Sequence, residues 1–182
     1  MTVRIDHPPS SGLPGILLRQ LEPIDMAAWH AYLSLPEVYE HTSWNLHAAA
    51  DLAPQFEGFA SAAPDSIRRM AIVDQATAGV IGTIGFHTVS TANRAAEIAY
   101  DLSPAYWGRG IARAVCASVT AWSFSHYGFQ RVQAVVLRSN ARSARVLAAC
   151  GYRCEGLLRS YRMVRGRPGD FSIYSRLATD PA

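Results

Sequence analysis

Hydrophobic and polar positions follow two different periods along this chain of 182 residues. The first part predicts a strand over 15–21, a helix over 23–34 that opens with proline, and a second helical segment over 48–60. Three β-branched or alternating runs follow, separated by short polar turns, over 68–74, 79–89 and 95–102. Consecutive runs of this kind are typical of the strands of an antiparallel meander.

The second half predicts a strand–helix–strand unit with a further helix and two closing strands. A helix over 111–127 has one apolar face at helical spacing, formed by Ile111, Val115, Val119 and Trp122. The remaining segments are a strand, a short helix with Asn140 as its N-cap, and two strands, over 131–137, 140–150, 152–164 and 170–177. We therefore expect an α/β fold whose mixed sheet has about seven mostly antiparallel strands, with about four helices on its faces.

The composition fits a single globular domain. Hydrophobic residues make up 49% of the chain and charged residues 17%, and no apolar run approaches the roughly 20 residues of a membrane span. We expect a flexible leader over 1–14, which is rich in Pro, Ser and Gly, one domain over 15–178 and a tail over 179–182. The three cysteines lack CxxC spacing, which favours a reduced, cytoplasmic protein without a membrane partner.

Charge is distributed unevenly along the chain. Residues 1–100 contain 5 basic and 10 acidic residues, a net −5, whereas residues 101–182 contain 12 and 4, a net +8. Every basic residue is Arg, whose planar guanidinium suits phosphate. The two halves are therefore predicted to contact different partners. Nucleic acid is not expected to be one of them, because the interleaved aromatics of nucleic-acid modules are absent.

The segment 104–114, PAYWGRGIARA, places two glycines at the start of the strongest predicted helix. Unpaired backbone N–H groups and a partial positive charge at a helix N-terminus favour an anion, and glycine lets a phosphate come close. A lone GxG can equally form a tight strand-to-helix turn. The chain has no lysine and hence no Walker loop, and Arg113 stands where a dinucleotide fingerprint needs its third glycine.

Longer motifs are more specific than this turn alone. The stretches AEIAYDLSPAYWGRGIA and SNARSARVLAACGYRCEG, followed by Gly166 and Asp170, resemble the GNAT superfamily of acetyl-CoA-dependent N-acetyltransferases. The pieces YWGRGIA, NxxSxRVL and GYRCEG resemble the branch that acetylates the N-terminal amines of ribosomal proteins. The resemblance covers about 16–177. It implies that an amine, such as a protein N-terminal amine, attacks the thioester directly, with no covalent enzyme intermediate.

The resemblance also implies a coenzyme A site. The backbone N–H groups that would hold the pyrophosphate belong to Gly108, Arg109, Gly110, Ile111 and Ala112. The strand from Tyr100 to Leu102 would pair with the pantetheine arm through its backbone. Asn140 would face the pantetheine or support the opening between two strands, and Arg145 would reach the nucleotide phosphates. The superfamily often has Gln or Arg where this chain has Ala105, so one side-chain contact is lost.

Acetyl transfer needs a base, a donor to the thioester oxygen and a proton for the departing sulfur. Glu97 is the predicted base, because alternation can point it at substrate, and partial burial would help by raising its pKa modestly. A surface carboxylate on a strand edge is the alternative. The superfamily's usual tyrosine is replaced by Leu147, so the resemblance makes Ser143 the candidate proton donor, unless it merely caps its helix. The backbone N–H of Leu102 is the expected donor to the thioester oxygen.

No sequence motif in this chain identifies the acceptor. Tyr39 and Trp44 are the candidate acceptor-binding residues, although core aromatics would show the same pattern. The acidic first half suits a cationic acceptor, and the Arg-rich second half suits a coenzyme with several phosphates. The histidines lack metal-ligand spacing, so no metal is expected. The alternatives are a small amine or antibiotic-like acceptor and a non-catalytic acyl-CoA sensor, in a monomer or homodimer.

Overall fold

The computed structural model of the chain describes residues 5, 7–61 and 63–181. Seven strands form one sheet in the order β1-β2-β3-β4-β5-β7-β6. Their bounds are Ile16–Gln20, Arg68–Asp74, Gly79–Ser90, Ala95–Leu102, Arg131–Leu137, Arg153–Val164 and Arg167–Leu177, for β1 to β7 in that order. Neighbouring strands are antiparallel except β4 and β5, which are parallel. The predicted mixed sheet, mostly antiparallel, is confirmed.

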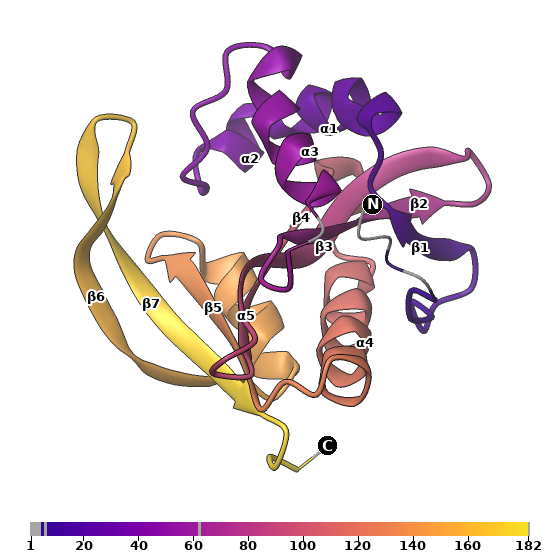
Figure 1. Cartoon of the computed structure of the whole chain (residues 1–182). Helices are drawn as coiled ribbons and strands as arrows, with labels where there is room; N and C mark the ends of the chain where they lie inside the picture. Colours follow the sequence, from indigo (N-terminus) through magenta and orange to yellow (C-terminus); the bar gives the residue numbers. More distant parts are fainter. Residues whose placement is uncertain (1–4, 6, 62, 182) are drawn as a thin grey trace.

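Five α-helices accompany the sheet in the described part of the chain (Figure 1). They are α1 Met26–Leu33, α2 Pro36–Tyr39, α3 Ala53–Ala60, α4 Ile111–His126 and α5 Ala141–Ala149. The sequence predicts about four, and the additional one is α2, a single turn too short to show a helical period. Figure 1 shows α1, α2 and α3 gathered together, well separated from α4.

Strand alternation divides the core into two clusters. On β2, Met70 and Ile72 pack in the cluster that contains the buried face of α4, whereas Ala71 and Val73 pack in the cluster under α1 to α3. Successive side chains of a strand point to opposite faces, so both faces of the sheet are covered. Val115 of α4 is completely buried, and burial of such a side chain stabilises the fold by roughly 1.5–3 kcal/mol.

The parallel pair β4 and β5 opens soon after it begins. The two strands pair only at Ala95–Arg131, Ala96–Val132 and Glu97–Gln133. Beyond that point β4 continues to Leu102 and β5 to Leu137 without pairing to each other. The facing edges of both strands therefore present backbone groups that a ligand can bond. The candidate functional site lies at this opening.

The segment before β1 is packed against the domain, contrary to the predicted flexible leader. Ile5 is 7% exposed and belongs to the core cluster that contains α4. Ser11 Oγ donates to the Ile16 carbonyl at 2.6 Å, and Ser118 of α4 donates to the carbonyl of Ser10. The prediction is wrong for residues 5 and 7–14, because one buried isoleucine and these hydrogen bonds order a segment of turn-forming composition.

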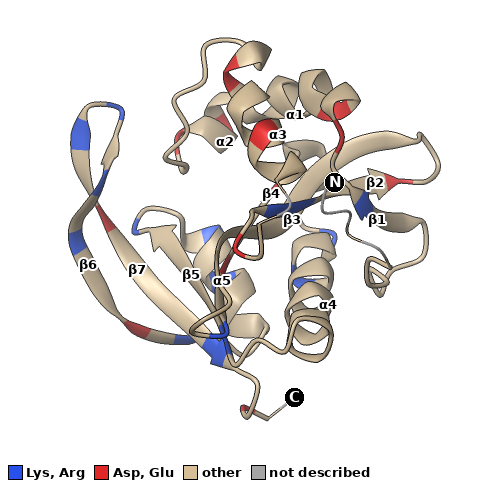
Figure 2. Ribbon diagram, viewed as in Figure 1, with Lys and Arg blue, Asp and Glu red and all other residues tan. Residues whose placement is uncertain are grey.

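Figure 2 shows how the uneven charge is arranged in space. Acidic residues gather on α2 and α3 and on the segments beside α1 to α3, and arginines dominate β5 to β7 and α5. The opening between β4 and β5 lies between these two regions. None of the helices in the described ranges is long and apolar enough to cross a membrane.

Candidate active site

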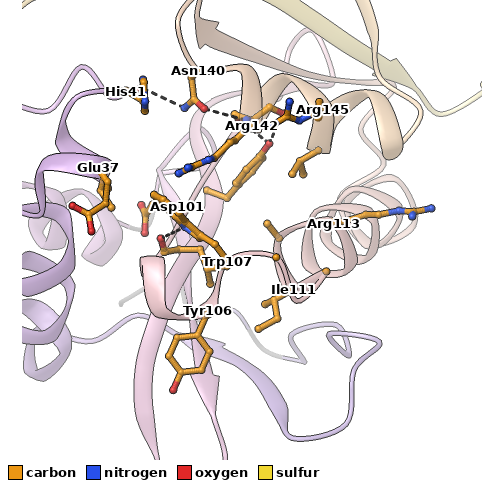
Figure 3. A pocket seen from close by; sticks show the side chains of 18 of the residues that line it. Glu37, His41, Asp101, Tyr106, Trp107, Ile111, Arg113, Asn140, Arg142 and Arg145 are labelled. Atoms are coloured by element: carbon orange, nitrogen blue, oxygen red, sulfur yellow. Dashed lines mark hydrogen bonds between the residues drawn. The ribbon is translucent and has the colours of Figure 1, made fainter.

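A cavity of about 700 Å³ lies beside the end of β4 that does not pair with β5, next to α4 and α5 (Figure 3). Its walls come from β4, the turn after it, the first turns of α4 and α5, and α2. The structure brings together most of the predicted coenzyme residues here: Tyr100, Leu102, Gly108, Gly110, Ile111, Ala112, Asn140 and Arg145. Arg109 is not among the lining residues, because its guanidinium lies over the Tyr106 ring, 4.9 Å from the centroid.

The N-terminus of α4 is open to this cavity. Gly108 and Gly110 both have φ of +75°, in the left-handed region that favours glycine. Gly110 is the N-cap, and no side chain caps the helix, so first-turn N–H groups are available to an anion. A Cβ at either glycine would meet nothing within 4 Å. Backbone conformation, and not crowding by the protein, therefore requires glycine at both positions.

Two further arginines line the cavity, and neither was predicted from the sequence as a site residue. Arg113 lies in the first turn of α4, and Arg142 lies three residues before Arg145 on α5. The Arg142 guanidinium lies over the Trp107 ring, 4.2 Å from its centroid; both side chains are labelled in Figure 3. Such stacking orders a guanidinium. The i, i+3 spacing of the two α5 arginines was a usable signal, because residues at that spacing share a helix face.

Tyr100 bridges the opening from β4 to α5. Its hydroxyl donates to the Ser143 carbonyl at 3.1 Å and lies 2.8 Å from Ser143 Oγ. Burial raises the pKa of the Tyr100 phenol well above its ordinary value, so the phenol stays protonated. Asn140 caps α5 by accepting from the Ser143 N–H at 3.0 Å, and its Nδ2 donates to the His41 carbonyl at 3.3 Å. Leu147 is fully buried.

A second cavity of about 300 Å³ adjoins the first. Both are lined by Tyr100, Asp101, Asn140 and Ser143. Trp44, a predicted acceptor residue, lines the second cavity, together with Trp29 of α1 and Phe59 of α3. Tyr39 lines neither cavity, because its ring packs 4.6 Å from the Arg165 guanidinium at the tip of the β6–β7 hairpin.

Glu97 is the last residue of β4 that pairs with β5, and it is 5% exposed. Its carboxylate contacts His87 Nε2 at 2.8 Å, Gln133 Nε2 at 3.0 Å and Arg162 Nη2 at 3.1 Å. Burial alone would raise the pKa of Glu97, but the hydrogen bonds from His87 and Gln133 and the nearby positive charges outweigh it and hold the pKa at about 2. The expected modest rise in this pKa is wrong.

His87 reaches Glu97 because of an irregularity in β3. Phe86 pairs with Ile98 and Thr88 pairs with Glu97, so His87 is an extra residue in its strand. A β-bulge of this kind re-aims a side chain, and here the imidazole both meets the carboxylate and lines the second cavity. Its Nδ1 lies 3.2 Å from Thr88 Oγ1. A bulge interrupts alternation, so the sequence pattern gives no sign of this contact.

Asp101, which faces both cavities, is the centre of a buried polar network. It pairs with Arg69 Nη2 at 2.6 Å, with both side chains 6% exposed. The Tyr32 hydroxyl donates to it at 2.5 Å, and the Thr83 N–H donates at 3.1 Å. The network joins α1, β2, β3 and β4, and the negative charge of Asp101 is compensated within the protein.

Comparison with known proteins agrees with this geometry. Residues 16–153 match the family model described as an acetyltransferase (GNAT) domain. An N-acetyltransferase of Bacillus subtilis (strain 168), itself uncharacterised, is 34% identical over 162 residues, which cover 88% of this chain and 92% of that protein.

Two solved structures share the fold. A ribosomal-protein-S5-alanine acetyltransferase from Vibrio fischeri has a TM-score of 0.76 at 21% identity, covering 92% of this chain and 96% of that one. A spermidine N-acetyltransferase from Vibrio cholerae, in complex with CoA and spermine, has a TM-score of 0.78 at 21% identity, covering 90% and 95%. The chain thus belongs to the GNAT family and is an N-acetyltransferase.

Proposed function

We propose that this enzyme transfers an acetyl group from acetyl-CoA to a primary amine, with the amine of a protein N-terminus as its acceptor. The observation that carries the proposal is the pair of adjoining cavities, which share residues on β4 and α5 at the opening of the sheet. Two substrates can meet there without a covalent enzyme intermediate. The ribosomal-protein motifs of the sequence and the Vibrio fischeri structure support a protein N-terminus.

The larger cavity fits coenzyme A by its chemistry. Uncapped N–H groups of α4 suit a pyrophosphate, and Arg113, Arg142 and Arg145 supply charge-assisted donors for phosphates. The unpaired edge of β4 suits the amides of a pantetheine arm. Bound there, acetyl-CoA supplies a thioester whose carbonyl carbon an amine can attack.

The base in this proposal is a pair of residues. A carboxylate whose pKa is about 2 is a weak base, so Glu97 serves by fixing the His87 ring through Nε2. The imidazole Nδ1 then accepts the proton that the amine loses as its N–C bond forms. Glu97 thereby becomes a positioning residue, and the predicted direct role passes to His87.

A second proton must reach the sulfur as the C–S bond breaks. Ser143 Oγ lines both cavities and is 2.8 Å from the protonated Tyr100 hydroxyl. We propose that Ser143 donates this proton and that Tyr100 supports it by hydrogen bonding. The buried Leu147 offers no hydroxyl in its place.

The test is turnover of acetyl-CoA, followed as release of free thiol with a panel of N-terminal peptides and small amines. Thiol release that depends on an amine, with one acetyl group appearing on that amine, is the expected result. Coenzyme A binding without release for any acceptor would identify a sensor of acyl-CoA and overturn the proposal.

A further inference from the structure

Two residues that line the second cavity each have a buried nitrogen atom with no hydrogen-bond partner among the described residues. These atoms are Nε1 of Trp29, whose side chain is 1% exposed, and Nδ1 of His41. The indole N–H is a donor only, and His41 Nδ1 is a donor in one of its tautomers. A buried donor left unpaired is costly, so these positions call for a ligand with an oxygen that accepts hydrogen bonds.

The charges of the cavity disfavour a polyamine. Arg69 and Arg162 line it, and Arg162 is already paired with Glu97. Asp101 is its only carboxylate among the described lining residues, and it is already paired with Arg69. A second ammonium group on the acceptor would find no free carboxylate among the described lining residues. The acceptor is therefore expected to carry one amine beside neutral or anionic groups, although the first half of the chain is acidic.

The remaining wall is aromatic and apolar. Trp29 and Trp44 meet edge to face at 5.9 Å between ring centroids, and Phe59 and Ile67 extend the same surface. Such a surface favours a large apolar side chain on the acceptor.

We propose that the acceptor is an α-amino acid or the N-terminal residue of a peptide, with a large apolar side chain. The aromatic wall holds that side chain, while the Trp29 N–H and His41 Nδ1 receive the carbonyl or carboxylate oxygen next to the amine. This inference rests on the proposed acetyl transfer and names the acceptor class for it. It replaces the cationic acceptor that the charge distribution of the sequence predicts.

The first experiment compares kcat/KM for matched acceptors. The set is the peptides Phe-Ala-Ala and Ala-Ala-Ala, free phenylalanine, phenethylamine, which lacks the carbonyl, and spermidine. Phe-Ala-Ala should exceed Ala-Ala-Ala by about 10-fold or more, because each buried methylene contributes strongly to discrimination. The kcat/KM of the better of Phe-Ala-Ala and free phenylalanine should exceed that of phenethylamine by a similar factor. Comparison of Phe-Ala-Ala with free phenylalanine shows whether the acceptor is a peptide or a free amino acid. Equal rates for Phe-Ala-Ala and Ala-Ala-Ala, or preference for spermidine, would overturn the inference.

A variant of Trp29 tests the unpaired indole N–H directly. Trp29→Phe removes the indole N–H and keeps an aromatic ring, so the advantage of the carbonyl-bearing acceptor over phenethylamine should shrink several-fold, chiefly through KM. Trp122→Phe is the matched control, because Trp122 stacks on His126 of α4 outside both cavities. An unchanged ratio in Trp29→Phe would show that the indole does not receive the acceptor.

Calorimetric binding of the two peptides, with coenzyme A present, separates this inference from the proposed function. Tighter binding of Phe-Ala-Ala than of Ala-Ala-Ala supports the acceptor class even if no thiol is released. Equal binding, or binding of neither, contradicts it. Failure of turnover with every acceptor, in contrast, bears on the proposed acetyl transfer.

Discussion

Glu97 shows how its neighbours decide what a carboxylate can do. Three side chains from three different strands donate to it, and a buried carboxylate so well satisfied is held ionised. The same bonds that make it a poor proton acceptor make it a rigid support for an imidazole. Residues around Glu97 therefore bear on both the stability and the rate of this enzyme.

The low pKa of Glu97 predicts a loss of stability in acid. Its pKa is about 2 in the folded protein against an ordinary 4.5, so its contribution is present above the ordinary value and is lost as pH falls toward the folded value. The contribution is at most about 3 kcal/mol. Urea unfolding across this pH range should show a flatter dependence in Glu97→Gln than in the wild type, and parallel curves would contradict the network.

The proposed base predicts different outcomes for two histidines. His87→Gln should lower kcat by about 100-fold, because the amine then loses its proton acceptor. His126→Gln is the control, since His126 stacks on Trp122 away from both cavities. A fully active His87→Gln beside an inactive Glu97→Gln would return the base role to Glu97.

At the scale of elements, the site is formed by two helix N-termini that face the opening between β4 and β5. The start of α4 is uncapped, whereas Asn140 caps α5. Each first turn carries an arginine into the larger cavity. This arrangement concentrates positive charge and free N–H groups where a strand ladder is interrupted, which suits a long anionic ligand that also has amides.

The α4 and α5 arginines predict a specific kinetic change. Arg113→Gln and Arg145→Gln should each raise KM for acetyl-CoA several-fold with little change in kcat, because they remove binding that is equal in ground and transition states. The effect should weaken at high salt. Arg159→Gln on β6 is the control, as Arg159 is exposed and lines neither cavity. Equal effects in all three variants would argue against a coenzyme site here.

Much of the element layout follows from the sequence, because strands and long helices carry regular patterns over many residues. The seven strands and the four longer helices lie close to their predicted ranges. The GxG turn was also a usable signal, since positive φ at Gly108 and Gly110 needs glycine. The His87 contact, the stacking of Tyr39 on Arg165 and the buried Ile5 were not predictable, because each depends on a bulge or on contacts between distant segments.

At the scale of the molecule, the Asp101 network joins α1 to three strands beside the site. Asp101→Asn leaves the Arg69 charge unpaired in the interior, and loss of one partner of a buried ion pair typically costs about 3–5 kcal/mol. Urea unfolding should report a loss of this order. Glu57→Gln, an exposed change on α3, should alter stability by less than about 0.5 kcal/mol. A similar small change in Asp101→Asn would show that the network adds little.

In the proposed reaction the two adjoining cavities hold both substrates at once, and the amine attacks the thioester directly. Initial-rate kinetics with acetyl-CoA and a reactive amine varied together test it most directly. Direct transfer in a ternary complex predicts double-reciprocal lines that intersect. Parallel lines, together with an acetylated enzyme isolated in the absence of amine, would show a ping-pong route through a covalent intermediate and would contradict direct transfer.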